Sequence, residues 1–209
     1  MNYDIIGDIH REYELLVGLL VKLGYKEIKG SWRRYNHTAI FLGDLIDKGP
    51  QQIATVNLVR RMVEEGSAKC ILGNHELNAI AWATPDPYMP RAYLRRHAKP
   101  GNLKQHANFL KEVKGRSIHN EFVEWFKTLP LWLDLGSIRV VHACWNNRYM
   151  RELKQKWGLK SDQTLTDELF VASTKEAKMG NAEHPAFIAV EALCKGLEAQ
   201  LPEGYSFKD

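Results

Sequence analysis

The chain has 209 residues, of which 44% are hydrophobic and 26% are charged, and this balance excludes a disordered or fibrous protein. No apolar run has the roughly 20 residues that a membrane-spanning helix needs, and the opening residues MNYDIIGDIH lack the basic and apolar regions of a signal peptide. The three cysteines lie far apart without a CxxC pair, which predicts free thiols and a cytoplasmic protein.

The net charge of +4 is concentrated in one segment. Between Arg91 and Arg116 there are eight Lys or Arg residues and a single acid, Glu112. Such a segment is either a solvated helix face and loop or a surface that attracts an anionic substrate, and both interpretations stay open here. A nucleic-acid-binding module is a weaker alternative, because it would rest on this segment alone.

The first part of the chain alternates between short apolar runs and helical patterns. We predict strands in 3–10, 38–44 and 68–76, of which the first and third run into a loop, and helices between them in 11–24 and 50–66. Because this is a βαβαβ order with buried strands, it predicts a parallel sheet covered by helices.

The pattern changes after residue 83. The proline-rich segment TPDPYMP predicts irregular structure, and LWLDLGSIRVVHA predicts an antiparallel pair of strands around a turn. We therefore predict a single domain, 1–209, with a helical or irregular cap inserted around 84–128. Further helices are expected near 103–113, 117–128, 164–172 and 185–200.

Four predicted strands end in side chains that can bind a metal. Asp after Gly is commonly a turn or a helix cap, and a single His at a strand end is commonly hydrogen-bonded in the core. Four strand ends of the same character instead favour one site, because parallel strands bring their carboxyl ends together. The residues concerned are Asp8 and His10, Asp44 and Asp47, Asn74, His75 and Glu76, and His142.

The types of donor limit the metal. Carboxylate, imidazole and amide donors without a thiolate suit Mn²⁺, Fe or Zn²⁺, and we favour Mn²⁺. Several carboxylates and imidazoles in one place predict two divalent ions about 3.5–4 Å apart.

Together, the motifs GDIH, GDLIDKG and GNHE, followed by VVHA, resemble the signature motifs of the calcineurin-like metallophosphoesterases, in particular the phosphoprotein phosphatase branch and its bacterial serine/threonine phosphatases. The resemblance runs from residue 4 to about residue 143. It implies an α/β fold in which two mixed β-sheets pack together with helices outside, and we expect the second sheet to be incomplete.

The resemblance also implies a role for each site residue. Asp44 would bridge the two metals, His75 would be the general acid, and Asp47 would hold His75 by a hydrogen bond. A metal-bound hydroxide would attack phosphorus. The remaining metal ligands would be Asp8 and His10 at the first metal, and Asn74 and His142 at the second.

The sequence departs from the family pattern around the substrate. Arg11 stands where the family usually has Gly, Lys48 stands where it usually has Arg, and the Arg that commonly follows GNHE is missing. Lysine can neutralise a phosphate oxygen but cannot bind two of them as a fork. The candidate substrate-binding residues are therefore Arg11, Lys48, Arg91, Arg95 and Arg96.

The family also has a later metal-binding histidine, and the only histidine after His142 is His184, in a different local context. We therefore expect part of the C-terminal sheet to be absent from this chain and its second metal site to be weak.

Three functions remain open. The first is metal-dependent hydrolysis of phosphate monoesters, on phosphoproteins or on small phosphate esters. The second is hydrolysis of dinucleoside polyphosphates, and the third is a metal-binding fragment with little or no activity. The sequence predicts neither a membrane partner nor a nucleic-acid partner.

Overall fold

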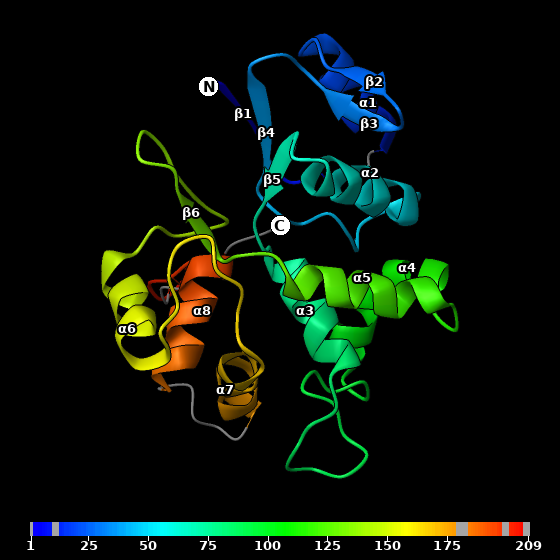
Figure 1. Cartoon of the computed structure of the whole chain (residues 1–209). Coiled ribbons are helices and arrows are strands. Elements are labelled where there is room, and N and C mark those ends of the chain that lie inside the picture. The colour runs from blue at the N-terminus through cyan, green and yellow to red at the C-terminus, as the bar shows by residue number, and fades with distance from the viewer. Residues whose placement is uncertain (1, 10–12, 179–183, 198–200, 207–209) are drawn as a thin grey trace.

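The central element of the fold is a small parallel sheet. The computed structural model describes residues 2–9, 13–178, 184–197 and 201–206. The sheet has the strand order β1-β4-β5, and Phe41 pairs with Ile6 on one side and with Cys70 on the other (Figure 1). Its strands are β1 (Asn2–Ile6), β4 (His37–Phe41) and β5 (Ala68–Cys70).

One face of this sheet is covered by helices α1 (Tyr13–Lys22) and α2 (Gln52–Glu64). Side chains of a strand alternate between its two faces, and Ala39 and Phe41 accordingly belong to the same hydrophobic cluster as these helices. Ile40 points to the opposite face and belongs to a different cluster. The buried middle strand therefore separates two apolar layers.

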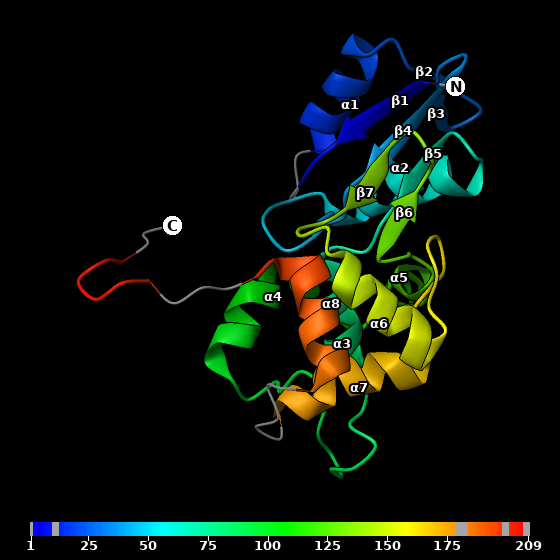
Figure 2. The same cartoon turned by 90° about the vertical axis from the view of Figure 1, so that its left-hand side faces the viewer.

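The opposite face is covered by an antiparallel hairpin of β6 (Trp132–Asp134) and β7 (Arg139–Val141). Figure 2 shows the hairpin beside the parallel sheet. Leu133 and Val140 of the hairpin pack against Ile40 of the sheet in the smaller cluster. Two sheets thus pack face to face, as the expected sandwich requires.

A second helical layer lies behind the hairpin. Trp132 belongs to the larger cluster, which also contains Met150 and Leu153 of α6 (Asn147–Trp157). The order of layers is helices, parallel sheet, hairpin and helices, and the expected α/β fold class is confirmed. Within the described residues, parallel and antiparallel pairs lie in separate small sheets, not in two mixed ones.

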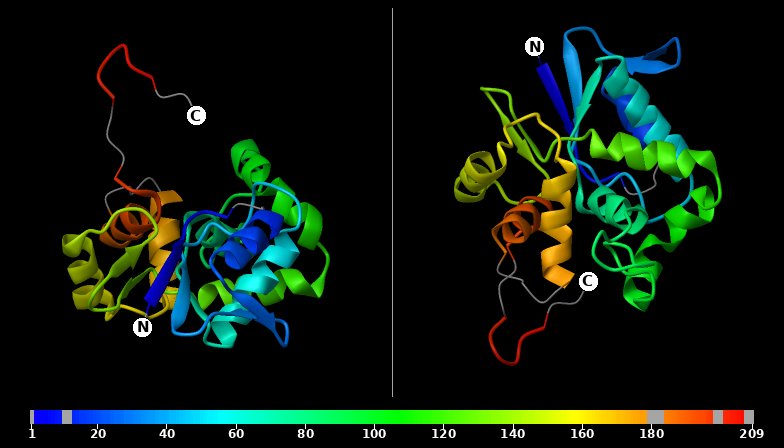
Figure 3. Two further views of the ribbon diagram at one scale, coloured as in Figure 1. Left: turned by 90° about the horizontal axis from the view of Figure 1, so that it is seen from above. Right: turned by 60° about the horizontal axis from the view of Figure 1, so that its bottom comes forward.

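The remaining helices lie below the sheet in Figure 1, and Figure 3 shows them in two groups on either side of the strands. Phe109, Phe122 and Phe126 are fully buried in the first group, where Phe109 stacks on Phe122 and both contact the tilted ring of Phe126. The first group contains α3 (Asn74–Ala83), α4 (Pro100–Val113) and α5 (Ser117–Lys127). The second contains α6, α7 (Asp167–Lys178) and α8 (Pro185–Lys195).

The structure adds three elements that the sequence patterns did not predict. These are α3, α6 and a short hairpin of β2 (Lys26–Ile28) and β3 (Ser31–Arg33). Helix α3 begins inside the GNHE motif, where we expected a loop. All the other predicted helices and strands are present, with shifted ends. Among the described helices, none has both the length and the apolar character needed to cross a membrane.

Candidate metal centre and active site

The ends of three strands bring Asp8, Asp44 and His142 together. Asp8 follows β1, Asp44 follows β4 and His142 follows β7. One donor atom from each lies within 4.8 Å of the others. Asp44 is buried with 3% exposure, whereas Asp8 is exposed. The cluster is therefore anchored in the core and open to solvent on the Asp8 side.

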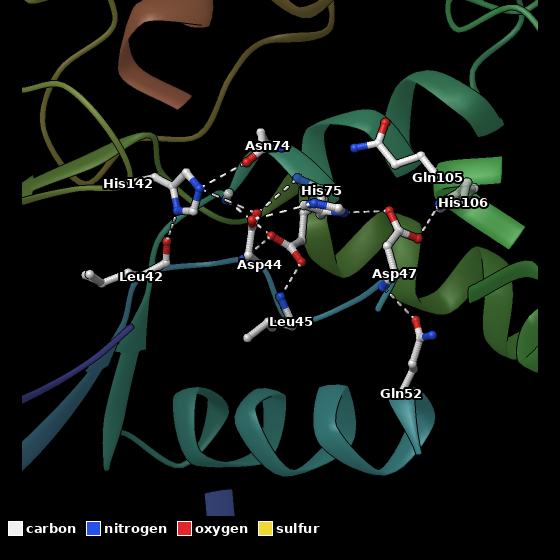
Figure 4. Close-up of polar contacts among 12 residues, drawn as sticks. Leu42, Asp44, Leu45, Asp47, Gln52, Asn74, His75, Gln105, His106 and His142 are labelled. Atoms are coloured by element: carbon white, nitrogen blue, oxygen red, sulfur yellow. Dashed lines mark hydrogen bonds and ion pairs between the residues drawn. The ribbon is translucent and has the colours of Figure 1, made fainter. Parts of the chain in front are cut away.

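The protonation of His142 indicates what this cluster can hold. Its Nδ1 lies 2.6 Å from the carbonyl oxygen of Leu42, which can only accept, so Nδ1 carries the proton (Figure 4). In that tautomer Nε2 carries a lone pair, and it lies 3.1 Å from Asn74 Oδ1 and 3.5 Å from Asp44 Oδ1. One imidazole nitrogen and two side-chain oxygens thus converge, and a divalent cation with oxygen and nitrogen ligands fits this arrangement.

Glu76 joins the two loops that present Asp44 and Asn74. The Glu76 carboxylate is fully buried and accepts hydrogen bonds from the backbone N–H groups of Asp44 and Leu45, both at 2.8 Å, and from that of Gly73 at 3.2 Å. Burial and the neighbouring Asp44 charge raise the pKa of Glu76 to about 7. The site thus concentrates negative charge, which is a second observation that suits a cation.

The two loops touch at a pair of glycines. Gly43 has a φ of +89°, and a Cβ there would lie 2.4 Å from the backbone nitrogen of Gly73. A Cβ on Gly73 would lie 2.4 Å from Asp44 Oδ1. Asp44 itself has a left-handed backbone, with a φ of 53°. Side chains at either glycine would therefore force the two strand-end loops apart.

His75 and Asp47 form a hydrogen-bonded pair beside this cluster. His75 Nδ1 lies 2.8 Å from Asp47 Oδ2, and His75 Nε2 points toward Asp44, 3.8 Å from Oδ2. Burial opposes protonation of His75, but the hydrogen bond to Asp47 and the charges of Asp44, Asp47 and Glu76 raise its pKa. The imidazole is thus held as a proton donor whose Nε2 faces the site.

Asp47 has a second histidine partner, which the sequence analysis did not single out. His106 of α4 is buried, and its Nδ1 lies 2.7 Å from Asp47 Oδ1. Burial disfavours the charged Asp47, but the hydrogen bonds from His106 and His75 lower its pKa. The Asp47 N–H also donates to Gln52 Oε1 at 2.9 Å. Nothing in the local sequence around His106 marks it, since it lies 59 residues from Asp47.

Glu112, the single acid between Arg91 and Arg116, also supports the site. Helix α2 begins directly after the Asp47 loop, and Gln51 caps it with no side-chain hydrogen bond. Instead, Glu112 of α4 accepts from the backbone N–H groups of Gln52 at 3.1 Å and Ile53 at 3.2 Å. A carboxylate at a helix N-terminus is favourable. Helix α4 therefore fixes both ends of the 47–52 loop.

The expected substrate-binding cations are spread over several places. Arg95 and Arg96 line one pocket next to α3, whereas Lys48 and Arg91 are exposed and are not among its lining residues. The predicted metal ligand His10 and the predicted cation Arg11 lie outside the described residues. His184, at the start of α8, lines a different pocket together with Pro87 and Trp157.

Comparison with known proteins agrees with this geometry. The family model described as calcineurin-like phosphoesterase matches residues 1–189. A solved structure titled as a cold-active protein tyrosine phosphatase is similar in fold, with a TM-score of 0.59 at 13% identity. The structural match covers 98% of this chain and 59% of the chain of the tyrosine phosphatase.

Curated relatives are similar over about two thirds of the chain. The asymmetrical bis(5'-nucleosyl)-tetraphosphatase PrpE of Oceanobacillus iheyensis is 33% identical over 144 residues, which is 68% of this chain and 55% of the relative. The protein of the same name from Bacillus subtilis is 30% identical over 146 residues, 68% of this chain and 57% of the relative. The chain thus spans about half the length of these relatives.

We predict that Glu76→Ala destabilises the metal-free chain by about 3 kcal/mol, because three buried N–H groups lose their acceptor. Urea unfolding in the presence of a chelator measures this. The matched control is Glu64→Gln, which removes an exposed i,i+4 pair with Arg60. It should cost less than about 0.5 kcal/mol. Equal effects of the two variants would contradict the role assigned to Glu76.

Proposed function

Because the chain belongs to the calcineurin-like phosphoesterase family, we propose that it is a metal-dependent hydrolase that cleaves dinucleoside polyphosphates. The observation that carries the proposal is the convergence of Asp8, Asp44 and His142 beside the His75–Asp47 pair. This arrangement combines a cation site with a proton donor, which are the two requirements for displacement at phosphorus.

Family membership implies divalent metal ions. We propose that Asp8, Asp44, Asn74 and His142 bind them, with His10 as a further ligand, and that Mn²⁺ is preferred over Fe or Zn²⁺. When bound, such ions polarise phosphoryl oxygens and lower the pKa of water so that it can attack phosphorus. The Leu42 carbonyl supports this role, since it holds His142 with Nε2 directed inward.

We assign to His75 the proton that the leaving oxygen receives. Water attacks the phosphorus and releases one proton to solvent, the bond to the leaving oxygen breaks, and His75 Nε2 gives its proton to that oxygen. His75 then takes up a proton from solvent, so one water is consumed and the net proton count is unchanged. Asp47 fixes the orientation of the ring through Nδ1. His106 in turn fixes Asp47, and is a positioning residue because it acts through Asp47 alone.

The choice of substrate rests on the relatives. Both relatives described above are named as asymmetrical bis(5'-nucleosyl)-tetraphosphatases. Asymmetrical cleavage of four bridging phosphates yields a nucleoside monophosphate and a nucleoside triphosphate. We propose the same class of reaction for this chain, and we propose that the segment 84–128 is the cap over the site, because it supplies both His106 and Arg95. Cytoplasmic location stays a prediction.

A second candidate function is phosphate monoester hydrolysis on phosphoproteins or small esters. The well-held His75 favours it, because a general acid matters most when the leaving group is a poorly stabilised alkoxide. The fold alone does not decide between the two, since one fold supports many substrates.

We predict that the Mn²⁺-loaded chain cleaves diadenosine tetraphosphate to AMP and ATP at least tenfold faster, in kcat/KM, than it dephosphorylates a phosphoserine peptide. Chromatography of the nucleotides measures the first rate and phosphate release measures the second. Preference for the peptide would favour the monoesterase, symmetrical products would refute the cleavage pattern, and no turnover of either substrate would favour a non-catalytic metal-binding fragment.

We predict that His75→Ala keeps its metal content but loses about 10²–10⁴-fold in turnover, because it removes an acid and not a ligand. The loss should be smaller for aryl phosphates, whose leaving group needs less protonation. Asp44→Asn should instead lose metal, because a neutral amide is a poor bridge between cations. Elemental analysis of both purified variants distinguishes the roles, and metal loss in the histidine variant would make His75 a ligand.

We predict that His106→Ala lowers turnover about tenfold, because Asp47 loses one of its two imidazole partners. His106→Asn should recover much of this loss, since its amide can donate to Asp47 from a similar position. The decrease should be larger for phenyl phosphate than for p-nitrophenyl phosphate if His106 acts through the acid. An equal decrease for both esters would indicate a general structural defect.

A further inference from the structure

A basic pocket lies next to the metal cluster and has no role in the proposed chemistry. It has a volume of about 350 Å³ and lies between α3, the 94–102 segment, α7 and α8. This volume is within the range of small-molecule sites. Its charged lining consists of Arg95, Arg96, Lys99 and Lys195, with Glu191 as the single acid.

The charges of the pocket are only partly compensated from within. Lys195 and Glu191 pair with one another at 2.5 Å, as neighbours one turn apart on α8. Arg95 is half-buried and donates through Nη2 to Gln105 Oε1, but its buried Nε has no hydrogen-bond partner among the described residues. A buried guanidinium nitrogen without an acceptor is costly, so the Arg95 side chain is not fully compensated by these partners.

The pocket is a direct neighbour of the proposed catalytic groups. Asn78, which lines it, lies one helical turn beyond Asn74 on α3, a spacing that places their side chains about 5–6 Å apart. On the other side, Arg95 binds Gln105, which adjoins His106, the partner of Asp47 (Figure 4). A ligand with several phosphates can therefore reach from the metal cluster into the pocket.

We infer that this pocket binds the triphosphate part of the substrate, which leaves as a nucleoside triphosphate after cleavage. The inference rests on the proposed function and adds the reason for asymmetrical cleavage: the longer phosphate chain lies against Arg95, Arg96 and Lys99, and the phosphorus next to it lies at the metal cluster. Phe187, which is partly exposed, supplies an apolar wall against which the nucleoside can pack.

The composition of the pocket favours a polyphosphate over a single phosphate. Three cations, Arg95, Arg96 and Lys99, are available after Lys195 and Glu191 compensate one another, and each additional phosphate group adds negative charge for them to bind. The Asn102 amide also lines the pocket and can donate a further hydrogen bond, because only one of its two N–H groups is used, by the carbonyl oxygen of Arg96. Affinity should therefore rise with the number of phosphates.

The test measures binding to the metal-free chain by calorimetry in the presence of a chelator, with inorganic tripolyphosphate, ATP and AMP as probes. We expect tripolyphosphate and ATP to bind at least tenfold more tightly than AMP. The double variant Arg96→Glu/Lys99→Glu should weaken both by about tenfold or more, because both side chains are exposed and the changes reverse charge without disturbing the core. Arg95→Ala should weaken them as well.

The matched control is Lys104→Glu, an exposed lysine of α4 that does not line the pocket. It should bind the probes as the wild type does. Equal weakening by Lys104→Glu would show general attraction to a basic surface and would overturn the inference. Wild-type affinity in the double variant would overturn it too.

Activity distinguishes this inference from the proposed function. In the Mn²⁺-loaded chain, the double variant should lower the ratio of kcat/KM for diadenosine tetraphosphate to that for p-nitrophenyl phosphate at least tenfold. If the wild type binds tripolyphosphate but hydrolyses only monoesters, the pocket stands and the proposed substrate fails. If it hydrolyses the tetraphosphate without binding tripolyphosphate, the pocket is wrong and the proposed function stands.

Discussion

The buried carboxylate of Glu76 is the interaction on which the geometry of the site depends. It accepts backbone N–H groups from the loops after β4 and β5, and so holds two strand ends at one separation. The contact between Gly43 and Gly73 allows that separation to be small. Asp44 lies on the first of these loops and Asn74 directly follows the second, so the Glu76 bonds help to bring their oxygens together, as does the His75 N–H group, which donates to Asp44 Oδ1 at 3.1 Å. The left-handed backbone of Asp44 is maintained by the same bonds, since Glu76 binds its N–H group.

Helix α4 connects the cap segment to this site in two ways. His106 holds the side chain of Asp47, and Glu112 holds the first N–H groups of the helix that follows the Asp47 loop. Both side chains come from this one helix. Packing of α4 through Phe109 therefore also fixes the orientation of His75, through Asp47. The hydrophobic and polar parts of this region depend on each other.

Charge is distributed unevenly around the site, in a way that suits a polyanionic ester. Carboxylates gather where the cations of the family would bind. The positive charges of Arg95, Arg96 and Lys99 line a pocket that also contains Asn78, one helical turn after Asn74 on α3. The carboxylates repel phosphate unless cations compensate them, whereas the basic pocket attracts it directly. Metal loading and recognition of the phosphate chain are thus separate contributions to binding.

The sequence by itself determined the parallel sheet, the antiparallel hairpin and the residues at the strand ends, because apolar periodicity and the GD and GNHE motifs are local signals. It did not predict α3, whose residues after GNHE are almost entirely buried, from Leu77 to Trp82, and so show no amphipathic period. Only the tertiary structure decided that His106 is a partner of Asp47 and that Glu112 caps α2. Both contacts join residues about 60 positions apart, and they exist because the packing of α4 brings them together.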